Sequence, residues 1–450
     1  MKKEIQIVQQ SVERYREQIL AAERYIWNNP ESGYREWKTH AYMKAQFEAL
    51  GYELQEAGNI PGFWVDVNTG KEGPTLAIFG EMDSLIVPTH PEADPQTGAV
   101  HACGHHCQCA ALLGVAAALK DPAVLEGLSG TIRLIVVPAE ELIEVAFRKE
   151  LKAQGIIRYF GGKQEFMYRG VLDGVDLGMM IHTAGGQAYG CNGGSNGCMI
   201  KEATFIGKSA HAGGSPQKGI NALYASNCAM QAANALRETF VEKDYIRFHP
   251  IITAGGSAVN SIPDHVAVES YVRGASMEAI GAANKKINRA FAGSAAAMGC
   301  GLHLWDQHGY APRIYDANLK KLCYQTGLEL YPEELVKFTE QWTTGCSDMG
   351  DVSCVMPAIH PYMGGAEGPS HSSEYRIVDP VIACVESAKI QTLITVRLLE
   401  NGAENALDIL SKARKDYPTI PEYLAMIDAN CIDQEAVTYE EDGTVTLKYQ

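Results

Sequence analysis

The chain has 450 residues, of which 46% are hydrophobic and 20% charged, and its formal net charge is −16. This length exceeds the usual size of a single hydrophobic core, so we expect two domains. The negative charge argues against nucleic acid and anionic membranes as partners, because both select a positive protein surface. The first 24 residues are charged throughout, unlike a secretory signal, and no apolar run approaches the length of a membrane span.

Cysteine usage bears on the compartment. Of the 12 cysteines, Cys103, Cys107 and Cys109 fall within one short segment. Scattered cysteines in a long chain without a secretory signal are typical of reduced thiols with a metal ligand among them, not of a disulfide framework. We therefore expect a cytoplasmic protein.

The N-terminal part predicts helices followed by an alternation of strands and helices. Residues 5–27 carry apolar side chains at helical spacing up to Asn28-Asn29-Pro30, and a second helix is expected over 37–50. Short apolar runs at 75–79, 131–137 and 177–181 indicate buried strands, and an Ala/Leu-rich helix over 106–119 separates the first two. This pattern predicts an α/β domain with a largely parallel sheet.

Polar side chains follow each of these predicted strands. Asp83 comes after the first strand, Glu140 and Glu141 after the second, and His182 at the end of the third. Open α/β sheets bind ligands beyond the carboxyl ends of their strands, so these side chains are expected to meet at one edge of the sheet.

A different pattern begins near residue 193. Segments 195–205, 257–262 and 265–273 suggest half-buried antiparallel strands, with helices expected over 221–238 and 276–298. We predict a catalytic domain formed by residues 1–193 and 305–450, interrupted by an α+β lid or dimerisation domain over 194–304. The last part is expected to contain an apolar segment at 352–356, a helix over 380–399 and a hairpin near residues 441–443.

The segment His101-Ala102-Cys103-Gly104-His105 places a thiol and an imidazole two residues apart. Cysteine, histidine and glutamate together suit zinc, and nickel, cobalt or manganese where carboxylate and water complete the shell. A structural zinc site is poorly supported, because such sites favour closed Cys/His sets. A glutamate left over beside these ligands is what metal-assisted hydrolysis requires.

Five motifs in a fixed order resemble a known family. They are His101–His105 with the following Ala/Leu helix, Pro138-Ala139-Glu140-Glu141, Lys208-Ser209-Ala210-His211-Ala212-Gly213, Asn260-Ser261-Ile262-Pro263-Asp264 and Asp348-Met349-Gly350-Asp351. The series resembles the dinuclear metal-dependent amidohydrolases and carboxypeptidases, which include aminoacylase, carboxypeptidase G-type enzymes and auxin-conjugate hydrolases. Among them the para-aminobenzoyl-glutamate hydrolases, whose chains are subunits of a larger enzyme, are the most similar. The resemblance extends from about Trp27 to Leu399 and implies a metallopeptidase-like fold.

The resemblance also implies two divalent metal ions per chain, zinc or manganese first. Their ligands would be Cys103, His105, Glu141, His182 and His371. Glu140 would be the general base, and Asp83 would orient a ligand imidazole. His360, in a similar apolar-to-glycine context eleven residues before His371, is the alternative last ligand.

In the inserted domain the resemblance gives His211 a role in the active site of a neighbouring protomer, where it would stabilise the oxyanion. Asn260 and Arg273 would bind the substrate carboxylate, for which a guanidinium is well suited. A homodimer is therefore expected, and a heteromer is an alternative because the most similar family members are parts of a larger enzyme.

The implied reaction is hydrolysis of the amide bond of a small N-acyl or N-aroyl amino acid, such as para-aminobenzoyl-glutamate. A dipeptidase, an aminoacylase of the same family, or a non-catalytic subunit are the alternatives. The chain departs from the family pattern after His105, where Asp or Asn is usual and this sequence has His106, followed by Cys107 and Cys109.

Overall fold

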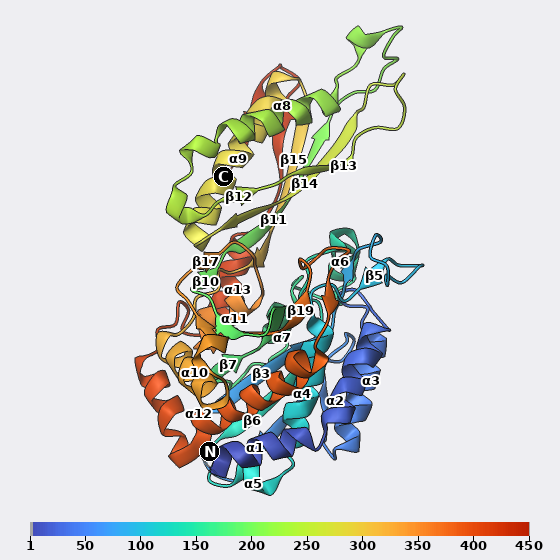
Figure 1. Cartoon of the computed structure of the whole chain (residues 1–450). Coiled ribbons are helices and arrows are strands. Elements are labelled where there is room, and N and C mark those ends of the chain that lie inside the picture. The colour runs from blue at the N-terminus through green and yellow to red at the C-terminus, as the bar shows by residue number, and fades with distance from the viewer. Residues whose placement is uncertain (1–2, 450) are drawn as a thin grey trace. The chain divides into compact units, whose positions relative to one another are not determined.

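The computed structural model describes residues 3–449 and divides into two compact units (Figure 1). The first unit extends to Gly194 and also contains Ile314–Trp342 and Ser347–Tyr423. The second contains Ser195–Arg313, Thr343–Cys346 and the segment that starts at Leu424. No helix within residues 3–449 is long and apolar enough to cross a membrane.

The first unit is built on a six-stranded sheet in the order β1-β2-β6-β3-β7-β18. Its strands are β1 (Gln55–Glu56), β2 (Phe63–Asn68), β3 (Thr75–Glu81), β6 (Thr131–Val137), β7 (Leu177–Met179) and β18 (Ala358–Ile359). β3 runs parallel to β6 and β7, β7 runs parallel to β18, and β2 is antiparallel to β1 and β6. The predicted mixed, largely parallel sheet is confirmed.

Helices of the first unit pack on this sheet. They include α1 (Lys3–Glu13), α2 (Arg16–Trp27), α3 (Trp37–Ala49), α4 (His105–Ala118) and α12 (Ser387–Lys412). Every residue of α4 is buried, because the helix contacts β3 and also packs against α2 and α12. The predicted helical segment 5–27 is two helices, α1 and α2, separated by a turn.

A smaller sheet in the first unit joins distant segments. It contains β8 (His182–Gly185), β9 (Tyr189–Cys191), β16 (Val336–Phe338), β19 (Tyr362–Glu367) and β20 (Arg376–Ile377). β19 pairs in parallel with β8, with Tyr362 opposite His182. The start of β19 therefore lies beside His182, and the loop that follows β19 leaves beside the end of β8, where Ala366 is opposite Gly185.

Further helices of the first unit complete the description. They are α5 (Pro122–Leu125), α6 (Val145–Ala153), α7 (Gly162–Tyr168), α10 (Ala317–Leu330), α11 (Met349–Val355) and the π-helix η5 (Val381–Glu386), which runs directly into α12.

The second unit is an antiparallel sheet covered by two helices. The strand order is β12-β14-β11-β15-β21-β22, and β13 also pairs with β14. The elements are β11 (Gly197–Ile206), α8 (Ala222–Ala235), β12 (Arg247–Phe248), β13 (Ile251–Ala254), β14 (His265–Gly274), α9 (Met277–Ala297), β15 (Gly301–Tyr310), β21 (Ile432–Tyr439) and β22 (Val445–Leu447). Phe205, Val268 and Phe291 belong to the core between helices and sheet.

The units differ from the predicted domains at the C-terminal side. β15 pairs with β11 along its length, so the second unit continues past residue 304 to Arg313. The predicted hairpin near residues 441–443 is present as β21 and β22, but β21 pairs with β15 and so belongs to the second unit. The expected strand at 257–262 is instead a loop after β13, and Gly256 in this loop has a φ of +113° that interrupts extended structure.

Candidate metal centre

The turn before α4 orients the side chains of Cys103 and His105. Gly104 between them has a φ of +96°, and a Cβ added there would lie 2.6 Å from the Tyr375 hydroxyl and 3.0 Å from Thr183 Cβ. Only glycine accommodates both this conformation and this crowding. The backbone therefore presents the thiol and the imidazole from a fixed, tightly packed turn.

A first group of donors consists of Cys103, His105 and His182, whose ligand atoms all lie within 4.8 Å of one another. The Cys103 Sγ is 3.5 Å from the His182 Nε2. The His182 Nδ1 donates to the Thr183 carbonyl oxygen at 2.7 Å, which leaves Nε2 as the nitrogen that can bind a cation.

A second group consists of Cys103, Glu141 and His371, again with ligand atoms within 4.8 Å of one another. The His371 Nε2 lies 3.4 Å from the Glu141 Oε1. The backbone N–H of His371 donates to the Ala102 carbonyl oxygen at 2.9 Å, which ties the loop after β19 to the Cys103 turn. The sulfur of Cys103 is thus common to two neighbouring groups.

Asp83 connects the two groups. It is fully buried, and its Oδ1 accepts from the His105 Nδ1 at 3.1 Å while its Oδ2 accepts from the Glu141 N–H at 2.7 Å. With Nδ1 donating to Asp83, the His105 Nε2 is the nitrogen available to a cation. Asp83 thus contacts one residue of each donor group.

Glu140 lies beside the donors but in neither of the two groups. Its Oε2 is 3.9 Å from the His105 Nε2, and with Glu81 and His105 it forms a separate buried group. Burial raises the pKa of Glu140 well above its ordinary value, and the charges of Glu81 and Glu141 raise it further. A carboxyl group in these surroundings holds a proton more tightly than one in water.

The chemistry of these donors fits divalent metal ions. Two buried atoms that face the cluster, the His105 Nε2 and the Glu141 Oε1, make no hydrogen bond within residues 3–449. Their contacts are ion pairs, from the His105 Nε2 to Glu81 and Glu140 and from the Glu141 Oε1 to His371. Buried polar atoms without hydrogen bonds cost free energy, and cations bound at the two donor groups would remove that cost. Sulfur, imidazole nitrogen and carboxylate oxygen together are suited to zinc and to manganese.

Sequence reasoning missed a buried network next to this cluster. The Glu81 Oε2 lies 3.2 Å from the His105 Nε2, and the Lys163 Nζ lies 2.5 Å from both the Glu81 Oε1 and the Asp348 Oδ1. Burial opposes ionisation, yet Lys163, together with the nearby histidines, lowers the pKa of Glu81 to about 2. Glu81 precedes Asp83 by two residues in an extended segment, and this spacing places both side chains on one face. That spacing is the sequence feature from which a position of Glu81 near the site could have been predicted.

The structure separates the two candidates for the last ligand. His371 belongs to the second donor group, whereas His360 belongs to neither. The ring of His360 packs instead against that of His182, with centroids 5.6 Å apart and an edge-on geometry. Geometry therefore favours His371.

The remaining predicted residues lie in the second unit. The His211 Nδ1 accepts from the backbone N–H groups of Gly213 and Gly214 at 3.2 and 2.9 Å. The N–H of Ala212 donates to the Asn260 carbonyl oxygen at 2.9 Å, so His211 and Asn260 are close in the fold.

Arg273 is not brought to Asn260. Asn260 precedes the first residue of β14, whereas Arg273 is near its last residue, opposite Cys198. Eight residue steps of strand separate His265 from Arg273, roughly 26 Å at 3.3 Å per residue. The structure therefore places Asn260 before the start of β14 and Arg273 near its far end.

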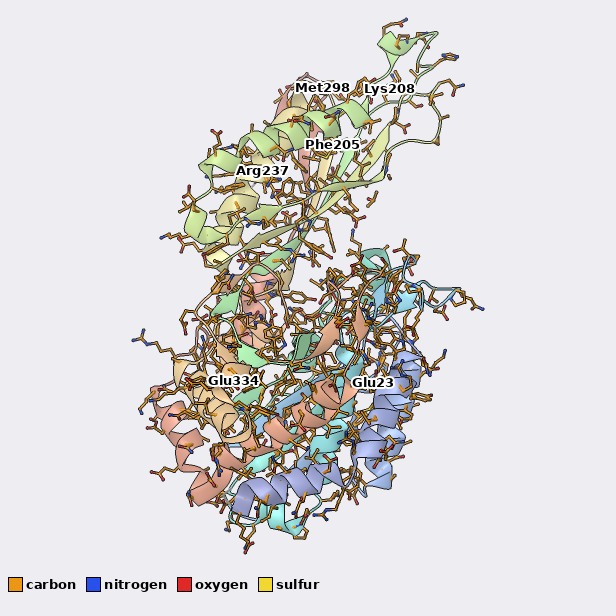
Figure 2. All side chains as sticks on the ribbon, in the orientation of Figure 1. Glu23, Phe205, Lys208, Arg237, Met298 and Glu334 are labelled. Atoms are coloured by element: carbon orange, nitrogen blue, oxygen red, sulfur yellow. The ribbon has the colours of Figure 1, made fainter. Side chains whose placement is uncertain are left out.

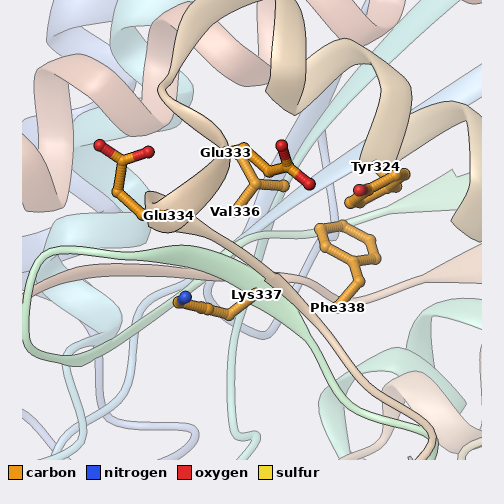
Figure 3. Close-up of a pocket in the computed structure, with 6 residues that line it drawn as sticks. All are labelled: Tyr324, Glu333, Glu334, Val336, Lys337 and Phe338. Atoms are coloured by element: carbon orange, nitrogen blue, oxygen red, sulfur yellow. The ribbon is translucent and has the colours of Figure 1, made fainter.

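A surface pocket elsewhere in the first unit has a different lining (Figure 3). It is lined by Tyr324, Glu333, Glu334, Val336, Lys337 and Phe338. None of the predicted ligands is among these residues, so the metal-binding chemistry is not at this pocket.

Comparison with known proteins identifies the family. Residues 193–297 match the peptidase dimerisation domain of the M20 family. The chain is 30% identical over 421 residues to the Xaa-Arg dipeptidase of Mus musculus, covering 88% of this chain and 86% of the relative. It is 26% identical over 280 residues to a subunit of the p-aminobenzoyl-glutamate hydrolase of Escherichia coli, covering 60% of this chain and 53% of the relative.

Solved structures show the same fold. A Bacillus subtilis protein described as a dinuclear metal-binding peptidase from the M20 family has a TM-score of 0.64 and 19% identity, covering 86% of this chain and 99% of that one. An aminobenzoyl-glutamate utilization protein from Klebsiella pneumoniae has a TM-score of 0.65 and 19% identity, covering 87% and 98%. The fold and the metal-ligand chemistry define a metal-dependent amidohydrolase or peptidase. The chain belongs to the M20 family.

Proposed function

We propose that the protein hydrolyses the amide bond of small N-acyl or N-aroyl amino acids, with para-aminobenzoyl-glutamate-like amides as the first substrates to test. The observation that carries this proposal is the pair of donor groups that share Cys103, with Glu140 beside them and in neither. A carboxyl group that is not consumed as a ligand remains able to accept a proton.

Two divalent ions would occupy the neighbouring groups. Cys103, His105 and His182 would hold one ion, and Cys103, Glu141 and His371 the other. When bound, such ions polarise the substrate carbonyl and lower the pKa of water. Zinc or manganese fits best, with nickel or cobalt as further options, and the thiol ligand favours the reducing cytoplasm.

The chain's own residues would transfer the proton of the attacking water and orient the metal ligands. Glu140 would accept the proton of the attacking water and deliver it to the leaving amide nitrogen, a task helped by the burial that raises its pKa. Asp83 would act as a positioning residue, because it fixes the His105 imidazole and the Glu141 backbone together.

We propose that a second copy of the chain completes the active site, with His211 stabilising the oxyanion of the partner protomer. The match of residues 193–297 to a dimerisation domain supports this arrangement. The separation of Asn260 from Arg273 along β14 also supports it, because contacts from both to one substrate would need two chains. Mixing inactive Glu140→Ala protein with inactive His211→Ala protein should then restore part of the activity, and no recovery would argue against a shared site.

A dipeptidase is the second candidate. The similarity to the Xaa-Arg dipeptidase covers 86% of that relative, whereas the similarity to the p-aminobenzoyl-glutamate hydrolase chain covers 53%. A heteromeric enzyme that contains this chain together with a different one is a further alternative, because that second relative is itself named as a subunit.

The test is a substrate panel given to the purified chain after loading with zinc or manganese. The panel holds para-aminobenzoyl-glutamate, N-acetyl and N-benzoyl amino acids, and dipeptides with and without C-terminal arginine. Turnover that disappears in the Glu140→Ala variant would support the proposal, and the preferred substrate would decide between acyl amino acids and dipeptides. A metal-loaded chain that cleaves nothing in the panel would contradict it.

A further inference from the structure

A second set of metal-ligand side chains lies where the sequence departs from its family. His106 and Cys107 follow the proposed ligand His105 in α4, and they meet Glu23 of α2. The His106 Nε2 lies 3.3 Å from the Cys107 Sγ and 3.4 Å from the Glu23 Oε1. The three donor atoms are within 4.8 Å of one another, and none of these residues belongs to the groups around Cys103.

This set is closed to solvent. Glu23 is 2% exposed, and His106 and Cys107 are completely buried. The rings of Trp27 and His101 pack against the His106 ring, with centroids 5.0 and 5.1 Å away. Figure 2 labels Glu23 within the first unit.

A further thiol, outside this set of three, adjoins Cys107 from a distant segment. The thiol of Cys384, in the π-helix η5, is fully buried and donates a hydrogen bond to the Cys107 sulfur. π-Helical turns are rare and recur at functional sites. Helices α2, α4 and η5, which are far apart in the sequence, therefore converge on one cluster of sulfur, nitrogen and oxygen atoms.

The two separations measured from the His106 Nε2 agree with those of a tetrahedral metal site. Bonds of about 2.0 Å to nitrogen or oxygen and about 2.3 Å to sulfur place the ligand atoms of such a site roughly 3.3–3.8 Å apart. Both distances from the His106 Nε2 are within this range or at its lower limit.

The charge balance also favours a cation. Two basic groups lie 3.4 Å from the buried Glu23 carboxylate: the Arg24 guanidinium, whose side chain is 51% exposed, and the buried His106 imidazole. A buried carboxylate beside thiols is stabilised by a divalent ion far more than by an ion pair open to solvent.

We propose that Glu23, His106 and Cys107, with Cys384 as the fourth donor, bind an additional divalent metal ion of the zinc class, separate from the proposed catalytic ions. The closed surroundings give this ion a structural role. It would join the N-terminal helix α2, the ligand-bearing helix α4 and the segment before α12. Its binding free energy would thereby stabilise the helix that begins with His105.

The test counts metal ions in the full-length chain. The protein is loaded with Zn²⁺, desalted, and analysed by mass spectrometry for zinc per chain. We expect about three ions in the unaltered chain and one fewer in Cys107→Ser and in His106→Asn, which introduces the residue usual in the family. Cys109→Ser is the matched control, because its thiol lies on the same helix but donates to the Glu81 carbonyl oxygen, and it should keep all ions.

The count separates this proposal from the proposed function. Cys103→Ser and Glu141→Ala should lose catalytic ions but retain the additional one, whereas Cys107→Ser should do the reverse. Equal zinc content in unaltered, Cys107→Ser and His106→Asn proteins would overturn the additional site. If Cys107→Ser and His106→Asn lose zinc but Cys103→Ser keeps all of its zinc, the additional site would be supported and the catalytic site contradicted.

A spectroscopic readout guards against variants that fail to fold. Cobalt loaded into the Cys103→Ser chain should still show thiolate-to-cobalt charge transfer in the near ultraviolet, since Cys107 remains. Adding Cys107→Ser should abolish that absorption while the circular dichroism stays unchanged. A Cys103→Ser chain that is folded but shows no such absorption would overturn the proposal.

Discussion

Two donor clusters flank the first turn of α4, and their surroundings differ more than their chemistry. The cluster around Cys103 includes His371, whose side chain is 52% exposed, whereas the cluster around Cys107 is closed to solvent. Both combine cysteine, histidine and glutamate. Access of solvent to the donors, rather than their identity, separates a site suited to hydrolysis from one suited to holding a structural ion.

The largest effect is expected on catalysis at the solvent-accessible cluster around Cys103. Glu140→Gln removes the proposed proton carrier and leaves the metal ligands in place, so kcat should fall by about 10²–10⁴-fold. Zinc per chain should be unchanged. Steady-state kinetics with metal analysis on the same preparation checks both, and a variant that retains full kcat would exclude Glu140 as the base.

The next effect concerns the buried ion-pair network of Lys163, Glu81 and Asp348 next to the Cys103 cluster. Lys163→Met leaves the carboxylates of Glu81 and Asp348 buried without their shared cation, which should lower the free energy of unfolding by about 3–5 kcal/mol. Denaturant unfolding measures this loss. Arg376→Met, which breaks an exposed pair with Glu367, is the control and should cost about 1 kcal/mol or less.

A smaller effect is expected at the residue that orients the ligands. Asp83→Asn keeps the shape but weakens the contact to the His105 Nδ1, and should reduce metal affinity or activity by about 10–100-fold. Metal titration followed by activity separates the two possibilities. Unchanged affinity together with unchanged kcat would show that Asp83 has no positioning role.

The smallest effect on activity is expected at the closed cluster. His106→Asn should lower the zinc-dependent part of the melting temperature while kcat at saturating metal changes less than in any variant above, because His106 is not in the Cys103 groups. Thermal melts with and without added zinc provide the measurement. If zinc raises the melting temperature of His106→Asn as much as that of the unaltered chain, the cluster around Cys107 does not bind a structural zinc ion.

Much of the fold could be predicted because its signals are local. The apolar run 131–137 coincides with β6, and the helices expected over 37–50 and 106–119 match α3 and α4 within a residue. The tail could not be assigned, because the pairing of β21 with β15 joins segments more than a hundred residues apart. Neither segment has a hydrophobic pattern that indicates which distant strand it pairs with.

In the candidate site, too, some residues could be predicted from the sequence and others could not. The donors Cys103, Glu141 and His371 were accessible through motif order, and the structure brings them together. The contact of Lys163 with Glu81 and Asp348 was not, since a lone lysine and a loop aspartate reveal no partner in the sequence. The same holds for Glu23 and Cys384, which reach His106 and Cys107 only through the packing of α2 and η5 on α4.

A crystal structure of the zinc-loaded chain, with anomalous diffraction recorded at the zinc edge, would show directly which residues bind zinc. We predict two peaks at the Cys103 groups with the sulfur of Cys103 bound to both ions, and a further peak between Glu23, His106 and Cys107. A fully loaded crystal with no zinc on Cys103 would contradict the catalytic assignment. The absence of the further peak alone would contradict only the closed site.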